Sequence, residues 1–398
     1  MSKLTDYDTW LGDDGPAALV IREPLVPVEG PDGVFFPATF AAGDGFPGGY
    51  NIDVFPSDAD AALVARGLGY TKGYKPTVEQ FPTAKNVCLV DSVGSQANRI
   101  EPLFAKDKYK SLVPQVVVTA GEKSVNLLEA GHRAGDAVVR STALQAELHK
   151  AFKAVQAGDA TLLAKVAPTS LVFGVWDSRN TQAKLPRLVA STIRAYDVRK
   201  ATRSAQYIPA TEYENDGLLP PPADLKLSEK VYGERGFGHV PATATHGGVT
   251  ATGGIRRDAT LSLAALRLLK GADADAELKL KRYVLGLALV ALTAPGATYL
   301  RAGCNLVPDV DKPRDFILVG SDGTRTVSKL THADALAYAA AAAVAFVVGP
   351  GQTVAFDKDL AKRDLTGEGD TSNTKKARTK AAKAKAADES TTAVAGAP

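Results

Sequence analysis

The densest run of chemically capable side chains lies between residues 177 and 203. Seven cations fall there against two acids, Asp177 and Asp197, which gives a local charge of +5. Trp176, Tyr196 and Tyr207 lie among or beside these cations, which are Arg179, Lys184, Arg187, Arg194, Arg199, Lys200 and Arg203. Aromatic faces stack on bases while guanidinium groups hold phosphates, so the run favours binding of single-stranded nucleic acid. A solvated basic face around one core tryptophan is an equally open interpretation.

His132, Arg133 and Asp136 are close enough in sequence to act on one substrate. Histidine suits proton transfer near neutral pH, and Arg133 or Arg140 can neutralise a phosphate, so the group fits an acid–base site of a ribonuclease. The structural interpretation is a buried histidine with Arg133 paired to Asp136 one helical turn later. The sequence by itself favours this second interpretation.

Two further segments carry groups that bind sugars and phosphates. The run 95–99 (SQANR) combines hydroxyl and amide side chains with a cation, although it equally suits a polar helix surface. The glycine-rich run 247–257 (GGVTATGGIRR) offers backbone N–H groups beside Arg256 and Arg257. It fits either a phosphate cradle or a flexible loop with two surface arginines.

The sequence indicates no metal or cofactor site. The five histidines and two cysteines have no ligand spacing, and there is neither a P-loop nor a GxSxG nucleophile elbow. Cys88 and Cys304 stand in apolar surroundings, which predicts buried thiols in a reducing compartment, and the N-terminus resembles no secretory signal. We therefore expect a cytoplasmic protein with no membrane segment.

Apolar periodicity predicts the elements that position these groups. The predicted helices are 57–65, one that begins within 91–101, 142–156, 260–270, 277–292 and 331–348, where Thr331 and Asp334 resemble a capping box. The predicted strands are 18–22, 86–90, 114–119, 171–175 and 188–198, with a tight hairpin of 316–319 and 324–327. On strand 188–198, Arg194 and Tyr196 share one face while Val189 and Ile193 share the other. Residues 208–252 show neither period and predict a long irregular insertion.

The charge of the chain is unevenly distributed. The 398 residues contain 47 Lys and Arg against 44 Asp and Glu. Residues 371–398 hold six of these cations and two acids, so the remainder carries 41 and 42 and is neutral. The tail also lacks apolar side chains large enough to build a core. A neutral body still allows nucleic-acid binding through a focused cationic stripe such as 177–203.

Five segments that contain these residues also resemble a known family. They are DSVGSQANRIE (91–101), GHRAGDAVVR (131–140), APTSLVFGVWDSRNTQAKLPRLVASTIRAYDV (167–198), RSAQY (203–207) and GGIRRDATLSLAALR (253–267). In this order they are similar to the backbone subunit of the type I-G (formerly I-U) CRISPR surveillance complex, a Cascade-like assembly, in the RAMP superfamily. The resemblance spans about residues 86–348, is loose before them, and does not include the tail.

The resemblance implies an α+β fold with a modified RRM-like (ferredoxin-like) palm whose large insertions form finger and thumb regions. Residues 1–356 would form one composite RNA-binding domain, with insertions at about 38–85 and 208–252. The second insertion would be the thumb. Residues 357–398 would be a basic, disordered, low-complexity tail.

The resemblance further implies a subunit that is not an enzyme. Copies of it would lie side by side along CRISPR RNA, leave the bases free to pair with target DNA, and join other subunits of a complex that recruits a helicase–nuclease. The residues implied in RNA contact are Ser95, Gln96, Asn98, Arg99, His132, Arg133, Trp176, Arg179, Lys184, Arg187, Arg203, Gln206, Tyr207, Arg256 and Arg257.

Two other functions stay open on the sequence. The first is a metal-independent endoribonuclease that uses His132 as general base near Arg133. The second is a stand-alone nucleotide-binding protein that uses the loop from Gly247 to Gly254.

Overall fold

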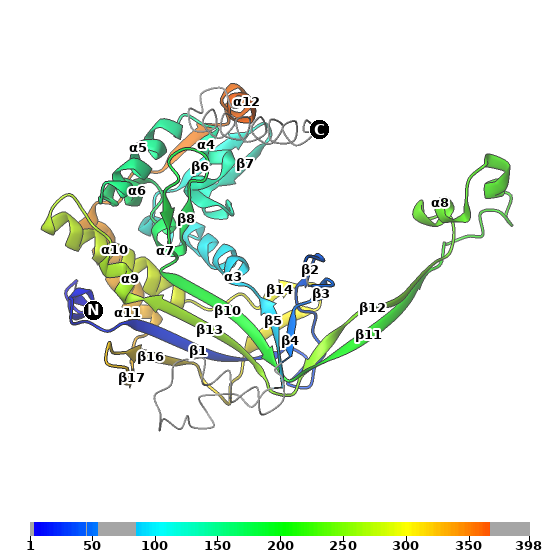
Figure 1. Cartoon of the computed structure of the whole chain (residues 1–398), viewed down its shortest axis with the longest axis horizontal. Helices are drawn as coiled ribbons and strands as arrows, with labels where there is room; N and C mark the ends of the chain where they lie inside the picture. The colour runs from blue at the N-terminus through cyan, green and yellow to red at the C-terminus, as the bar shows by residue number, and fades with distance from the viewer. Residues whose placement is uncertain (1–3, 45, 55–84, 367–398) are drawn as a thin grey trace, which may run out of the picture.

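A curled antiparallel sheet forms the centre of the computed structural model, which describes residues 4–44, 46–54 and 85–366 (Figure 1). In order across the sheet, its strands are β14 (Tyr299–Arg301), β15 (Cys304–Pro308), β1 (Ala18–Pro27), β13 (Ile255–Ser262), β10 (Val189–Tyr196), β5 (Asn86–Asp91) and β4 (Ile52–Val54). A hairpin of β16 (Asp315–Val319) and β17 (Arg325–Val327) also pairs with β1. Together with the helices on the sheet, this makes an α+β fold.

Alternation of side chains gives the sheet one buried face. On β1 the buried residues include Leu19, Ile21 and Leu25, and the side chains between them are partly exposed. On β10, Val189 and Ile193 are buried while Arg194 and Tyr196 are half-buried on the opposite face, as the sequence predicts.

Helices cover the buried face of the sheet (Figure 1). They are α3 (Val93–Ile100), α7 (Thr169–Phe173), α9 (Leu263–Arg267), α10 (Ala274–Thr293) and α11 (His332–Phe346). A Cβ atom at Gly286 of α10 would lie 2.8 Å from the Ala339 Cα of α11, so glycine permits the close contact of these two helices. The predicted capping box of Thr331 and Asp334 begins α11.

A second group of elements lies beyond α3 (Figure 1); most of it comes from the chain between β5 and β10, and β18 and α12 join it from the C-terminal part of the described chain. It contains a three-stranded sheet of β18 (Gln352–Ala355), β6 (Val116–Ala120) and β7 (Lys123–Asn126), together with α4 (Ala137–Arg140), α5 (Gln145–Gln156), α6 (Thr161–Val166) and α12 (Lys358–Thr366). Short 3₁₀ helices are η1 (Glu101–Ala105), η2 (Lys110–Leu112), η3 (Leu127–Glu129) and η4 (Arg133–Gly135). The helix α12 occupies the start of the predicted tail, and the rest of that tail lies outside the described residues.

Only part of the segment predicted to be an irregular insertion is a strand: residues 240–251 pair with 198–207 in a long β-ribbon, whereas residues 208–239 contain only two short helical elements. Strands β11 (Val198–Tyr207) and β12 (Val240–Ala251) pair antiparallel and project from the sheet, carrying η5 (Pro222–Leu225) and α8 (Glu229–Glu234) at their far end (Figure 1). The prediction agrees with the structure over most of residues 208–239 and is wrong for β12. Neither strand of the ribbon was predicted, because almost every side chain of β11 is exposed and the ribbon lacks the apolar alternation that signals a half-buried strand.

Two other predicted elements differ from the structure. Residues 171–175 form the end of α7 and the first residue of β8 (Val175–Trp176), because a short apolar run buried on all sides looks the same in sequence whether helical or extended. Residues 260–270 are the end of β13 followed by α9, which Ser262 caps. Buried and partly exposed side chains alternate along β13, but one of the buried positions is Arg257. A search for alternating apolar residues therefore does not detect this strand.

The other predicted elements are present with shifted ends. The helix predicted at 142–156 begins at Gln145, and the hairpin of β16 and β17 closes through a wider turn than the predicted two-residue one, with Gly320 N–H bonded to the Thr324 carbonyl. The helix predicted at 57–65 lies outside the described residues. The remaining short elements are α1 (Asp8–Leu11), β2 (Thr39–Phe40), β3 (Gly49–Tyr50) and β9 (Lys184–Leu185).

Both cysteines are free thiols inside the protein, as predicted. Burial raises the pKa of Cys88 to about 12 and that of Cys304 to about 11, so the thiols stay protonated and unreactive at neutral pH. Among the residues that the structure describes, no helix combines the length and the apolar character needed to cross a bilayer.

Candidate nucleic-acid interface

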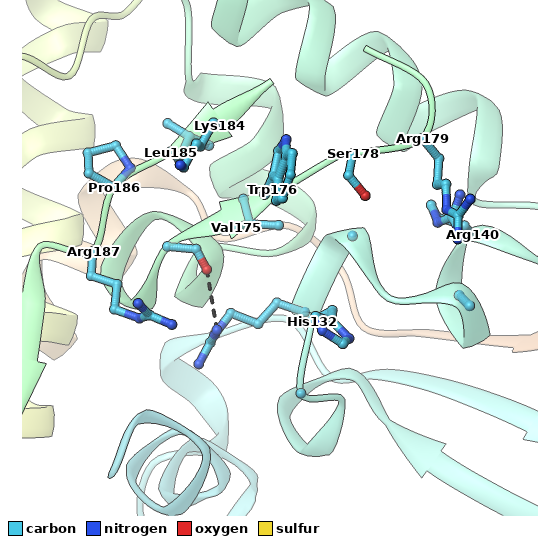
Figure 2. A pocket seen from close by; sticks show the side chains of 15 residues that line it. His132, Arg140, Val175, Trp176, Ser178, Arg179, Lys184, Leu185, Pro186 and Arg187 are labelled. Carbon is cyan, nitrogen blue, oxygen red and sulfur yellow. Dashed lines mark hydrogen bonds between the residues drawn. The ribbon is translucent and has the colours of Figure 1, made fainter. Parts of the chain in front are cut away.

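A cavity of about 640 Å³ brings six of the predicted RNA-contact residues together (Figure 2). Its walls are η4, the turn from α7 into β8, and the β8–β9 hairpin. The six residues are His132, Arg133, Trp176, Arg179, Lys184 and Arg187. Segments about 40 residues apart in sequence therefore form one cationic pocket with an aromatic wall.

Glycines allow the walls of this pocket to approach one another. A Cβ atom at Gly135 would lie 2.8 Å from the Trp176 carbonyl oxygen, so η4 packs directly on β8. Gly174 ends α7 with a φ of +79°, a conformation that favours glycine, and a Cβ there would meet the Arg187 side chain. The chain can thus turn sharply from α7 into the β8–β9 hairpin.

The Trp176 ring forms the aromatic wall and is 56% exposed. It pairs across the hairpin with Lys184, whose Nζ lies 5.6 Å from the centre of the ring. The adjoining loop is organised by buried Asp177, whose carboxylate accepts hydrogen bonds from the backbone N–H groups of Asn180 and Thr181. An exposed indole on a fixed hairpin offers a flat surface on which a nucleobase can stack.

Arg133 supports the pocket from inside the protein. Its Nε lies 2.6 Å from Glu101 Oε2, with both side chains almost fully buried, and its Nη1 donates to the Gly174 carbonyl at 3.3 Å. The ion pair predicted between Arg133 and Asp136 is wrong, because Asp136 instead caps α4 by accepting from Val138 N–H. Arg133 holds η4 against α7 and has little surface to offer a phosphate.

Desolvation raises the pKa of Glu101 to about 7, although Arg133 opposes the shift. Between about pH 4.5 and pH 7 the folded protein retains a proton that the unfolded chain releases, so the free energy of unfolding falls as the pH rises. This shift in the pKa of Glu101 corresponds to about 3 kcal/mol in the free energy of unfolding. We expect denaturant unfolding to show this loss between pH 5 and pH 8 in the wild type relative to Glu101→Gln, which cannot ionise. Equal pH dependence of the two proteins would contradict the prediction.

His132 and Arg133 do not form the predicted acid–base site. The His132 side chain is 87% exposed, with Nδ1 3.6 Å from Asp136 Oδ2, whereas Arg133 is buried in its ion pair. Arg140, the other predicted phosphate partner, is also largely buried and pairs with Asp364 of α12 at 3.2 Å. His132 therefore has no accessible guanidinium beside it from either Arg133 or Arg140.

Helix α3 places the predicted residues 95–99 in different environments. Gln96 is buried, donating to Asp91 Oδ2 and accepting from Ser191, so it joins α3 to the sheet. Asn98 is exposed, and its Oδ1 accepts a hydrogen bond from Arg133 Nη2 at 3.4 Å. This contact places this part of α3 beside the pocket. Ser95 is half-buried, and Arg99 is half-buried in an ion pair with Asp91 at 3.1 Å.

The remaining predicted contact residues lie on the ribbon and on β13, away from the pocket. Arg203, Gln206 and Tyr207 are exposed on β11. Arg256 lies on the outer face of the sheet, pairs with Asp258 at 2.8 Å and stands over the Tyr196 ring. Arg257 is buried in an ion pair with Glu23 at 2.7 Å. Of the run 247–257, Gly247 and Gly248 belong to β12 and Arg257 points into the core, whereas Gly253, Gly254 and Arg256 line a separate cavity of about 820 Å³, so a phosphate cradle there stays a prediction.

Arg301, which the fold brings to the end of α3, has no signal in the sequence. Its Nη2 lies 2.6 Å from Asp91 Oδ1, so that Asp91 contacts both Arg99 and Arg301. These two arginines are 202 positions apart in the chain, and no spacing rule connects them. Within the described residues, no group of three or more His, Cys, Asp or Glu side chains is placed to hold a metal ion.

Comparison with family models assigns these residues. The model described as CRISPR-associated protein GSU0053 matches residues 19–200, just under half of the chain. Residues 19–200 are thus similar to this CRISPR-associated family. The match contains α3 and every residue that lines the pocket. No curated protein matches the sequence.

The predicted contact residues fall partly inside and partly outside the region that matches the CRISPR-associated family. Ten of the fifteen, from Ser95 to Arg187, fall inside the family match, and the other five lie after it on β11 and β13. The match to a CRISPR-associated family supports a subunit of a Cascade-type complex that works with RNA.

Proposed function

We propose that the protein is a CRISPR RNA-binding backbone subunit of a type I-G interference complex, a RAMP-type scaffold and not an enzyme. The observation that carries the proposal is the pocket, where Trp176 and the cations Arg179, Lys184 and Arg187 converge within the region that matches the CRISPR-associated family. A stacking surface with flanking guanidinium and ammonium groups binds single-stranded nucleic acid whatever its sequence.

The sheet supports an RRM-like palm. An edge formed by β15 and β16 is followed by β1, β13 and β10, which is the strand order and antiparallel pairing of the split β-α-β ferredoxin-like unit. The crossover from β1 to β10 carries α3 and the pocket, and the connection from β10 to β13 is the ribbon. We assign the ribbon as the thumb.

The proposed RNA path follows exposed cations and avoids the buried ones. It runs along α3 past Asn98 and Arg99 and through the pocket, while the ribbon flanks it with Arg199, Lys200 and Arg203. Residues 198–207 contain three cations and no acid. Gln96, Arg133 and Arg257 support the fold in this proposal, because their buried side chains have little surface for contact with RNA.

The tip of the ribbon, residues 208–239, supports self-association. It has six acids against three cations, so it repels a phosphate backbone and suits a protein surface. Leu218, Leu225 and Phe237 are exposed there. Exposed apolar side chains grouped on one small tip mark a protein contact.

The partner that we propose for this tip is a second copy of the chain. An apolar groove of about 220 Å³ lies between α5, α7, β9 and α9, with Leu268 77% exposed at its rim and Lys270 beside it. The tip and these helices lie at opposite ends of the molecule (Figure 1), so a tip seated in the groove of the next copy makes a head-to-tail contact that repeats. The groove shares Leu185 and Pro186 with the pocket, so in this proposal the contact between copies lies beside the RNA.

The test of the proposed function is co-expression with a repeat–spacer RNA and the other subunits of the complex. We expect purified particles to contain several copies of the protein and protected RNA, with an ultraviolet 260/280 ratio typical of ribonucleoprotein. Protein that elutes as a monomer without RNA would refute the proposal. Cleavage of the RNA that disappears in His132→Ala would favour the endoribonuclease instead.

A further inference from the structure

We propose that Arg301 and Arg99, held by the buried carboxylate of Asp91, form a phosphate-binding site at the base of α3. The inference rests on the proposed RNA-binding function and adds to it a site that lies outside the pocket. It also adds a residue that lies beyond the family match and outside every segment of sequence resemblance.

Asp91 is fully buried and organises three side chains. Its Oδ2 accepts from Gln96 Nε2 at 2.7 Å and from Arg99 Nε at 3.1 Å, and its Oδ1 accepts from Arg301 Nη2 at 2.6 Å. The groups come from α3 and from β14, which are far apart in sequence. The carboxylate therefore fixes the positions of both guanidinium groups.

The site retains a positive charge. One carboxylate faces two guanidinium groups that are always protonated, so the three groups together carry a charge of +1. Both arginine side chains remain about a quarter exposed, 29% for Arg99 and 24% for Arg301, so an anion can reach them. A guanidinium that is already immobilised loses little further entropy when it binds.

Arg301 has donor capacity that the protein does not use. Its guanidinium has more N–H donors than the one that Asp91 accepts, and the side chain is 24% exposed, whereas Nη1 is buried near the Cys304 thiol. A ligand that supplies acceptors to the exposed N–H groups can therefore add charge-assisted hydrogen bonds. Arginine forks match the paired oxygens of a phosphate, so a phosphodiester is the ligand class that fits.

The position of the site agrees with a strand of RNA that passes along α3. Arg99 is one residue from Asn98, and Asn98 Nδ2 lies 3.5 Å from the position of a Cβ atom added to Gly131, a residue that lines the pocket. The arginine pair thus begins one residue after the part of α3 that lies beside the pocket. We infer that the pair holds a backbone phosphate next to the nucleotide that occupies the pocket.

The experiment measures binding of a fluorescein-labelled single-stranded RNA of mixed sequence by anisotropy at several salt concentrations. Arg301→Gln retains a donor for Asp91 but removes the charge. We expect it to weaken binding by about tenfold. The slope of log K against log salt should fall by about 0.7, the change expected when a single strand has one fewer of its phosphates neutralised. Arg301→Lys, which keeps the charge but not the fork, should weaken binding less.

Arg325→Gln is the matched control, because Arg325 is an exposed cation of β17, away from α3 (Figure 1). It should bind RNA like the wild type. Thermal unfolding of each variant checks that the fold is intact; if Arg301→Gln unfolds early, Arg301→Lys supplies the comparison. Wild-type affinity and slope in both Arg301 variants would overturn the inference. A wild-type protein that binds no RNA would instead refute the proposed function.

Discussion

Replacing Trp176 with alanine should weaken binding of single-stranded RNA by about 5- to 150-fold, the loss expected for one base stacked on an aromatic side chain. The indole is exposed and lies on a hairpin, so its removal leaves no cavity in the core. The measurement is a titration of labelled RNA followed by anisotropy, with thermal unfolding as a check on the fold.

The salt dependence of binding distinguishes stacking from charge at this pocket. Trp176→Ala should leave the slope of log K against log salt unchanged, because the indole carries no charge, and Trp176→Phe should recover much of the affinity. Arg179→Ala with Arg187→Ala should lower the slope by about 0.7 for each phosphate that the protein no longer neutralises. Wild-type affinity in Trp176→Ala would show that no base stacks there.

Removal of the ribbon tip should abolish assembly into multi-copy particles while a single copy still binds a short RNA. Tyr207 pairs with Val240 at the end of the ribbon, so residues 208–239 can be replaced by Asn-Gly, which closes a two-residue hairpin turn. The cations of β11 remain in this variant. Sedimentation of the co-expressed complex measures the number of copies in each particle.

Point variants locate the surface that receives the tip. Leu268→Asp, in the groove near α9, should reduce assembly as tip removal does, and the two changes combined should have no additional effect because they break the same contact. Val310→Asp is the control, since Val310 is also exposed but lies in the loop between β15 and β16. Particles of unchanged size from the tip-deleted protein would exclude the tip as the contact between copies.

Local sequence was sufficient for elements that bury one face or carry a capping signal. The strand 86–90, the two faces of 188–198 and the capped start of α11 all follow from side-chain period or local hydrogen bonding, and the structure confirms them. The same reasoning failed for the ribbon, because strands exposed on both sides have no apolar period. It also failed for Thr169–Phe173, where burial on all sides removes the period.

Which residue types are available to bind RNA follows from the amino-acid sequence alone. The cationic run with Trp176, and the segments that resemble a CRISPR backbone subunit, are local properties of the chain. Only the tertiary structure decided which of these side chains are accessible. Arg133 and Arg257 look like surface cations in sequence, yet each is buried against a carboxylate that is distant in the chain, Glu101 and Glu23 respectively. Arg301 approaches Asp91 for a related reason, since the partners of an ion pair are chosen by the packing of distant strands and helices, which spacing in a sequence does not encode.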